Sequence, residues 1–136
     1  MSVHRFDLRV YYEDTDLAGI VYYANYLKFI ERGRSEYLRA LGIDQTALRD
    51  TSGVVFAVRR VEADYLRPAV FDDHLCVTTA PRQVTGARIV LDQGVLRGEE
   101  VLFSALVTIV CLSGTGRPAR MPREVVAAFG AEAKTR

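Results

Sequence analysis

One segment of this chain has the pattern of a long helix, whereas most of the rest alternates like β-strand. Between residues 23 and 41, apolar or small residues recur at helical spacing and share one face: Tyr26, Ile30, Gly33, Tyr37 and Leu41. Gly42 follows directly, as is typical after the last turn of a helix. A helix of about five turns with a wide apolar face must be covered, and strands are the main elements available to cover it.

Patterns typical of β-strands precede and follow this helix in the sequence. Residues 6–12 alternate between apolar and polar side chains, which predicts a first strand. Similar patterns after the helix predict four more strands, at residues 54–65, 75–79, 87–91 and 101–112. A turn is predicted at residues 97–100, before the last of these strands. Short helices are predicted at residues 44–49, where Asp44 is a good N-cap, and at residues 124–129.

These elements predict an α+β fold in which an antiparallel sheet of about five strands wraps around one long central helix. The last four strands are expected to follow one another as hairpins. Residues 1–136 contain no linker or repeat and should form a single domain. A sheet of this size leaves a face or an edge poorly covered, so we expect a homodimer or a homotetramer.

The composition argues against several classes of function. The net charge is only +1, so the chain lacks the excess of basic residues that is typical of nucleic-acid-binding proteins. The most apolar segment, residues 101–112, is too short to span a bilayer, and the N-terminus has no signal-peptide core. We therefore expect a cytoplasmic protein without an integral membrane segment. Cys76 and Cys111 are expected to be free thiols.

The histidines give no support to metal or histidine-based chemistry. His4 and His74 lie 70 residues apart, and neither has a companion at metal-ligand spacing. Residues 14–16 resemble the start of a calcium-binding loop, but Asn25 stands where a bidentate glutamate is required. Serine-hydrolase and phosphate-loop motifs are absent from the sequence. We predict no metal site and no cofactor.

Carboxylates are the remaining reactive groups. Glu31 and Glu36 are five positions apart, roughly 140° around a helix, so they cannot both face one site. Asp16 differs from the other acidic residues because Gly19 permits a tight turn just before the long helix. Two roles remain equally open for Asp16: a structural role, as an Asx turn or a helix cap, and a catalytic role. Tyr22 and Tyr23 would ordinarily be core residues, but a backbone N–H in the first helical turn is also free to stabilise negative charge.

The segment Tyr12-Glu-Asp-Thr-Asp-Leu-Ala-Gly-Ile-Val-Tyr-Tyr-Ala-Asn25 resembles the signature of the hotdog-fold acyl-CoA thioesterases. The nearest types are the Tol–Pal-associated acyl-CoA thioesterases and the aspartate-dependent 4-hydroxybenzoyl-CoA thioesterases. The resemblance continues through residues 31–38 and 61–73 and into the strand that ends at Leu112, so it covers nearly the whole chain. It implies a hotdog fold and hydrolysis of an acyl-CoA to a free acid and CoA.

The resemblance also implies roles for individual residues. Asp16 matches the catalytic aspartate, acting as a nucleophile or a general base, and the Tyr23 backbone N–H matches the group that polarises the thioester carbonyl. Many Tol–Pal-type members carry histidine where this chain has Tyr23, whereas the hydroxybenzoyl type carries tyrosine. A general acid is not required, because a thiol with a pKa of about 8.5 leaves readily as the thiolate.

Further candidates concern substrate binding. Gly19 and Tyr22 are expected beside the substrate. The phosphates of CoA, which enters as part of the substrate, call for arginines, and we favour Arg82 and Arg88 because they flank a turn at Gly86. Several aromatic residues could accept an aryl group or simply fill the core: Tyr22, Tyr26, Phe56 and Tyr65.

Three alternatives to an Asp16-dependent thioesterase remain. A hotdog dehydratase that acts on acyl carrier protein would need a catalytic histidine, for which His4 and His74 are poorly placed. A second thioesterase type would use a carboxylate on the helix, Glu31 or Glu36. A non-catalytic module would keep the fold and serve as a binding or scaffold protein of the cell-envelope or phospholipid machinery.

Overall fold

The computed structural model describes residues 3–134 as one sheet with three α-helices. The longest helix, α1, has 16 residues, and no helix in the described part of the chain is long and apolar enough to cross a membrane. A 3₁₀ turn at Tyr12–Asp14 precedes α1. The elements follow one another in this order: β1 (His4–Arg9), α1 (Asn25–Ala40), α2 (Gln45–Ser52), β2 (Val54–Tyr65), β3 (His74–Val84), β4 (Ile89–Arg97), β5 (Glu100–Ser113), β6 (Pro118–Ala119) and α3 (Arg123–Lys134).

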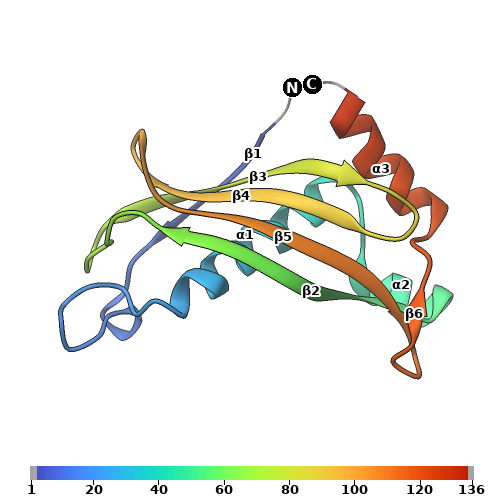
Figure 1. Cartoon of the computed structure of the whole chain (residues 1–136), viewed down its shortest axis with the longest axis horizontal. Helices are drawn as coiled ribbons and strands as arrows, with labels where there is room; N and C mark the ends of the chain where they lie inside the picture. The colour runs from blue at the N-terminus through green and yellow to red at the C-terminus, as the bar shows by residue number, and fades with distance from the viewer. Residues whose placement is uncertain (1–2, 135–136) are drawn as a thin grey trace.

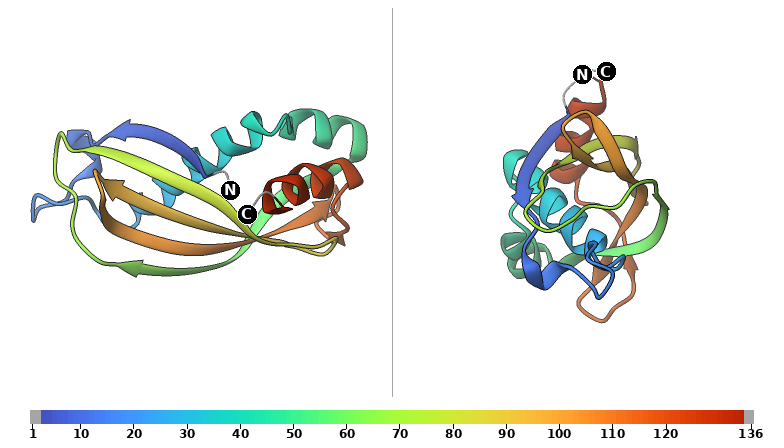
Figure 2. Two further views of the ribbon diagram at one scale, coloured as in Figure 1. Left: turned by 90° about the horizontal axis from the view of Figure 1, so that it is seen from above. Right: turned by 90° about the vertical axis from the view of Figure 1, so that its left-hand side faces the viewer.

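The sheet is antiparallel and has the strand order β1-β3-β4-β5-β2, with the short β6 added beside β5. It curves around α1, which packs against β1, β3 and β4 (Figures 1 and 2). Loop 10–24, the connection 66–73 and the β4–β5 turn gather at one end of the sheet, on the left in Figure 1. The β3–β4 turn and α2 lie at the other end. The predicted sheet around a long helix is confirmed.

The predicted strand pairing is wrong, and so are two predicted boundaries near the N-terminal end of the long helix. The last four strands are not successive hairpins, because β2 pairs with β5 and residues 66–73 carry the chain across to β3. The first strand ends at Arg9 rather than residue 12, since the Asp14 carboxylate accepts a hydrogen bond from the Tyr11 N–H at 2.7 Å and closes the 3₁₀ turn. Helix α1 begins at Asn25 rather than residue 23, because the Asn25 N–H closes a turn onto the Tyr22 carbonyl.

One face of α1 supplies much of the core, and six of its residues are buried: Tyr26, Phe29, Ile30, Gly33, Tyr37 and Leu38. Gly33 is the point of closest approach to the sheet. A Cβ at this position would lie 2.4 Å from the Val77 Cγ1 atom, so only glycine lets α1 pack this near to β3. The predicted helical face is therefore confirmed as the face that contacts the sheet.

A buried polar side chain fixes the orientation of α1 on the sheet. Gln93 of β4 is 1% exposed, and its Nε2 donates to the Ile30 carbonyl and to the Thr79 Oγ1, both at 2.9 Å. Its Oε1 accepts from the Arg34 guanidinium at 3.0 Å. Burial lowers the pKa of Arg34. Because each of these partners is specific, rotation of α1 would leave a buried amide unpaired.

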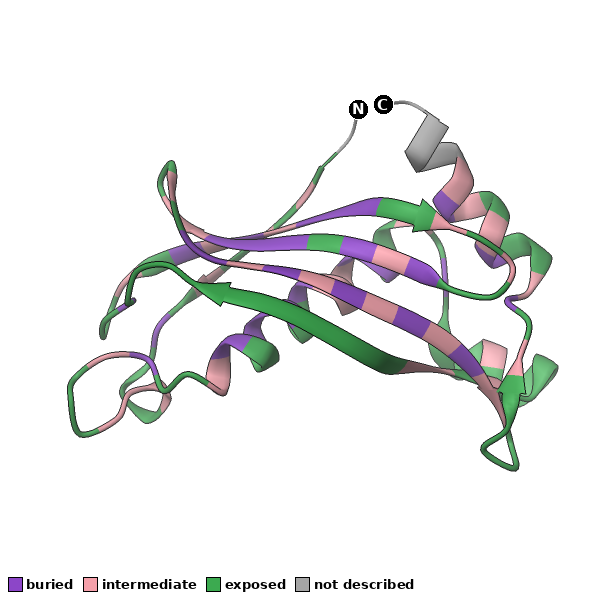
Figure 3. Cartoon of the chain, viewed as in Figure 1, coloured by how far each residue is buried: buried purple, intermediate pink, exposed green. Residues whose placement is uncertain are grey.

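Strand β2 lies at the edge of the sheet and is largely uncovered (Figure 3). Val58, Val61 and Tyr65 are opposite the buried Ile109, Val107 and Phe103 of β5, so they point to the same inner side of the sheet. They nevertheless remain 39–49% exposed, because α1 packs mainly against β1, β3 and β4. A single chain thus presents a long strand edge with an apolar inner side.

The two cysteines are free thiols, as predicted. Cys76 lies on β3 and Cys111 on β5, and β4 separates these two strands. Burial raises the pKa of Cys111 and keeps this thiol protonated.

We predict that Gly33→Ala lowers the free energy of unfolding by about 1–3 kcal/mol, because the new methyl group overpacks the contact with Val77. Gly130→Ala is the matched control: Gly130 also lies in a helix, and its added Cβ meets no atom within 4 Å. The control should stabilise the protein by about 0.5–1 kcal/mol. Urea unfolding of both variants measures the difference, and equal stabilities would contradict the proposed close approach.

Candidate active site

Loop 15–21 holds Asp16 in a compact turn ahead of α1. Thr15 and Val21 form an isolated antiparallel bridge. Inside it, the Asp16 N–H donates to the Ile20 carbonyl and the Gly19 N–H donates to the Asp16 carbonyl, both at 2.9 Å. Gly19 has a φ of +81°, which favours glycine. The turn predicted from Gly19 is present.

The Asp16 side chain has one engaged and one unengaged oxygen. Its Oδ1 accepts from the Ala18 N–H at 2.9 Å, which is the Asx-type contact expected for a structural role. Among residues 3–134, the second carboxylate oxygen has no hydrogen-bond partner. Asp16 also lines a cavity, so its structural contact and its access to a ligand coexist.

The approach to α1 leaves one backbone donor available. The Tyr22 N–H donates to the Asp14 carbonyl at 2.9 Å, and the Tyr22 carbonyl accepts from the Asn25 N–H at 2.8 Å. In a trans peptide the carbonyl and the next N–H point in opposite directions, so the Tyr23 N–H points away from this turn. It has no acceptor within the described chain. Tyr23 therefore lies just before the helix, not in its first turn as predicted, yet retains a free N–H.

The cavity beside Asp16 has a volume of about 380 Å³ and is mainly aromatic and apolar. Tyr65 packs edge-on against Phe103, with ring centroids 4.9 Å apart, and against Tyr26 at 5.5 Å. Asp16 and Arg67 are the charged residues of the lining, which consists of Asp16, Ile20, Val21, Tyr22, Tyr23, Tyr26, Tyr65, Leu66, Arg67 and Pro68. Such a cavity can enclose an apolar group next to one carboxylate.

Connection 66–73 forms the far wall of this cavity and is held at several points. The Ala69 N–H donates to the Tyr26 hydroxyl at 3.0 Å, and the Ala69 carbonyl accepts from the Val21 N–H at 2.9 Å. Asp73 accepts from Arg97 at 2.7 Å and from the Val70 N–H at 2.9 Å. Burial raises the pKa of Tyr26, so its hydroxyl stays neutral and available to accept. The wall is thus tied to α1, to loop 15–21 and to the β4–β5 turn.

The structure brings together some of the predicted site residues and separates others. Asp16, Tyr22 and Tyr23 line the cavity, whereas Gly19 lies in the turn and is not part of the lining. Arg82, which pairs with Asp92 at 3.5 Å, and Arg88 lie by the β3–β4 turn, at the opposite end of the sheet from Asp16 (Figure 1).

Arg67 was missed as a candidate from the sequence. Its guanidinium contacts Glu100 at 3.2 Å, and its position on the cavity wall follows from the 66–73 connection. The residues Arg67-Pro68 directly after a predicted strand were the available signal. Tyr26 and Tyr65, named as possible pocket residues, do line the cavity, whereas Phe56 does not.

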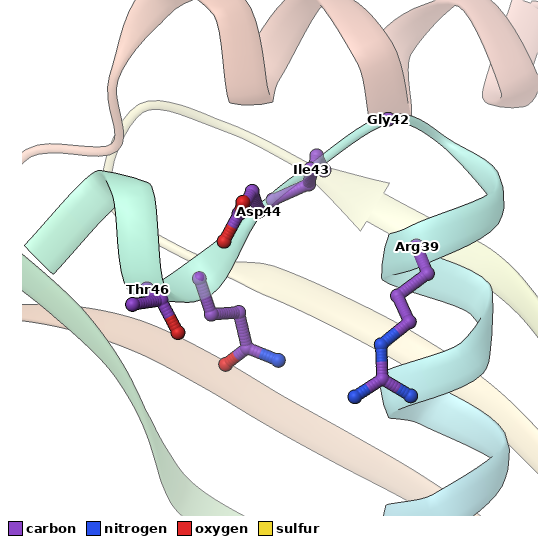
Figure 4. A pocket seen from close by; sticks show the side chains of 6 residues that line it. Arg39, Gly42, Ile43, Asp44 and Thr46 are labelled. Carbon is purple, nitrogen blue, oxygen red and sulfur yellow. The ribbon is translucent and has the colours of Figure 1, made fainter.

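A second hollow of about 420 Å³ lies between the end of α1 and the start of α2 (Figure 4). Its charged residues already have partners: Asp44 caps α2 by accepting from the Ala47 N–H at 3.1 Å, and Arg39 pairs with Glu36. In the described part of the chain no cluster of histidine, cysteine and acidic residues could hold a metal ion. The cavity beside Asp16 is therefore the better candidate for an active site.

Comparisons with known proteins identify the family of this chain. The family model of the thioesterase superfamily matches residues 18–104. The acyl-CoA thioesterase YbgC of Haemophilus influenzae is 43% identical over 125 residues, which is 91% of this chain and 92% of the relative. The acyl-CoA thioester hydrolase YbgC of Escherichia coli is 38% identical over 94% of this chain and 96% of its own length.

A solved structure gives the same result. A probable thioesterase from Bartonella henselae is 42% identical and has a TM-score of 0.85, with 89% of this chain and 100% of that chain covered. The sheet curved around α1 is the hotdog fold of these enzymes. The chain therefore belongs to the thioesterase superfamily and is a thioester hydrolase with the hotdog fold.

Proposed function

We propose that this protein hydrolyses acyl-CoA thioesters in the cavity beside Asp16. The proposal rests on one observation: two residues that line the same cavity each have a group without a hydrogen-bond partner in the described chain. These groups are one carboxylate oxygen of Asp16 and the backbone N–H of Tyr23. Thioester hydrolysis needs an attacking group and a donor for the oxyanion, and these residues supply both. Relatives that share most of this chain's length are acyl-CoA thioesterases, which supports CoA as the thiol.

Asp16 can start the reaction in two ways. As a nucleophile, its free oxygen attacks the thioester carbon, the C–S bond breaks, CoA leaves as the thiolate, and water then hydrolyses the mixed anhydride. As a general base, it takes a proton from water while that water attacks the same carbon. In both routes the carbonyl oxygen gains negative charge, which the Tyr23 N–H stabilises.

The aromatic lining favours acyl groups that are flat or apolar over charged ones, because Asp16 would repel an anionic acyl group and tyrosine rings offer large apolar surfaces. Assays with short, long and aromatic acyl-CoAs, measured side by side, define the acyl preference.

We predict that Asp16→Asn lowers kcat by about 10²–10⁴-fold while acyl-CoA binding stays within a few-fold of the parent. The amide oxygen can still accept from the Ala18 N–H, so the turn should be preserved. Glu13→Gln, which removes an exposed negative charge next to the same loop, is the matched control and should keep full activity. Steady-state hydrolysis and isothermal titration with a CoA thioether measure the two quantities; an active D16N variant would rule out Asp16.

Isotope labelling separates the two routes. Repeated turnover in ¹⁸O-water incorporates label into the Asp16 carboxylate only if that carboxylate attacks directly, because the anhydride is reopened by labelled water. Mass spectrometry of the tryptic peptide that contains Asp16 detects the incorporation, with the tryptic peptide that contains Asp44 as an internal control.

We also propose that two copies associate through β2. Its outer backbone edge is unpaired in the single chain, and its inner side is apolar at Val58 and Val61. A second β2 placed antiparallel across a two-fold axis would extend the sheet and cover the same surface on both copies.

We predict that the protein sediments at twice the 15.2 kDa mass of one chain, and that Val58→Asp together with Val61→Asp shifts it towards the monomer. The added carboxylates would face one another across the two-fold axis without a partner. Val101→Asp, at a valine of β5 that is similarly exposed, should leave the mass unchanged. Analytical ultracentrifugation measures the mass of each variant in solution. A parent protein that sediments as a monomer would refute the proposed association.

A further inference from the structure

Tyr65 makes a hydrogen bond that the reaction described above leaves unused. This tyrosine is the last residue of β2, and its hydroxyl donates to the Tyr23 carbonyl at 2.9 Å. The bond connects the edge of the sheet to the backbone just before α1. Within residues 3–134, the Tyr65 hydroxyl is the single recorded donor to that carbonyl.

The bond fixes one of two peptide planes that meet at the Tyr23 Cα. The Tyr22–Tyr23 peptide, which carries the Tyr23 N–H, is anchored by the hydrogen bond from the Asn25 N–H to the Tyr22 carbonyl. The Tyr23–Ala24 peptide is anchored by Tyr65. With both planes held, the two backbone dihedrals of Tyr23 are set, and with them the orientation of its N–H relative to α1.

The Tyr65 ring is itself held firmly, so its hydroxyl is a fixed anchor. Its centroid lies 4.9 Å from that of Phe103, 5.5 Å from that of Tyr26 and 6.1 Å from that of Tyr23. Phe103 and Tyr26 are both buried. Desolvation raises the pKa of Tyr65, and its hydroxyl therefore keeps the proton that it donates.

We propose that Tyr65 is a positioning residue for catalysis: its hydroxyl orients the Tyr23 backbone so that the Tyr23 N–H meets the developing oxyanion. The inference rests on the proposed thioesterase reaction and adds a second residue, 42 positions away in the sequence, to its oxyanion site. An oxyanion donor acts only when it is held in place before the reaction, which is what this bond achieves.

The test is Tyr65→Phe, which removes the hydroxyl and retains the packed ring. We expect kcat for the fastest acyl-CoA substrate to fall about tenfold, with KM within a factor of two, because a misdirected donor loses part of the stabilisation of the transition state. Tyr12→Phe is the matched control: Tyr12 is 81% exposed and lies outside the cavity lining, and its hydroxyl has no partner in the described chain, so both constants should be unchanged.

Inhibitor binding adds a readout that a purely structural role would not produce. A CoA-linked trifluoromethyl ketone mimics the oxyanion, whereas a CoA thioether of equal length has no carbonyl. Y65F should bind the ketone about tenfold more weakly and the thioether as well as the parent protein does. Thermal unfolding of Y65F and Y12F checks that both variants fold.

The outcomes separate this inference from the proposed reaction. A Y65F variant with kcat within twofold of the parent, or one in which only KM rises, refutes the positioning role. If D16N is inactive while Y65F is fully active, the thioesterase mechanism stands and only the role of Tyr65 is wrong. If D16N is active, the proposed reaction itself fails.

Discussion

The packing of α1 against the concave side of the sheet is the constraint on which the site depends. Gly33 permits the close approach to Val77, and the hydrogen bonds of Gln93 to Ile30 and Arg34 set the rotation of the helix. Once α1 is fixed in this way, its N-terminal end can lie only at the edge where loop 15–21 and connection 66–73 converge. The cavity is therefore a product of the core, since its walls are loops anchored to a rigid helix.

The loops around the cavity are stabilised mainly by backbone hydrogen bonds. The carbonyl of Asp14 accepts hydrogen bonds from both the Tyr22 N–H and the Asn25 side chain. The Ala69 carbonyl accepts from the Val21 N–H, and the Ala69 N–H donates to the Tyr26 hydroxyl. Except for the Tyr26 hydroxyl, these contacts fix the path of the chain without using the side chains that line the cavity. In loop 15–21 the Asp16 carboxylate retains a free oxygen, although the backbone N–H groups of Asp16, Ala18 and Gly19 are all bonded within the turn.

Much of the fold could be predicted from the sequence because hydrophobic periodicity is a local property. The helical spacing from Tyr26 to Tyr37 and the alternation of residues 54–65 required no knowledge of distant partners. The pairing of β2 with β5 could not be obtained in this way, since it depends on how residues 66–73 cross the end of the sheet. The start of α1 was misplaced by two residues because a turn at Tyr22 satisfies the same N–H groups as a helix would.

The candidate site shows the same division. Asp16 was found because Gly19 and the nearby helix are its neighbours in the sequence. Arg67 and the contact from Tyr65 to Tyr23 were missed because they join segments far apart in the chain, and Arg82 and Arg88 were favoured for a turn that lies at the other end of the sheet. A local pattern indicates the candidate reactive group, whereas the residues that surround it are brought together by the topology of the fold.

The uncovered strand β2 has a consequence for the behaviour of an isolated chain. A long exposed edge can pair with strands of any unfolded or misfolded neighbour and so seed aggregation. In the middle of β2 the register shifts between Val58 and Arg60, and the two consecutive arginines at 59 and 60 place positive charge at this irregularity. A bulge and charged side chains together disfavour the non-specific addition of other strands. The same strand therefore combines an edge that can pair with a second copy and features that oppose pairing with unrelated strands.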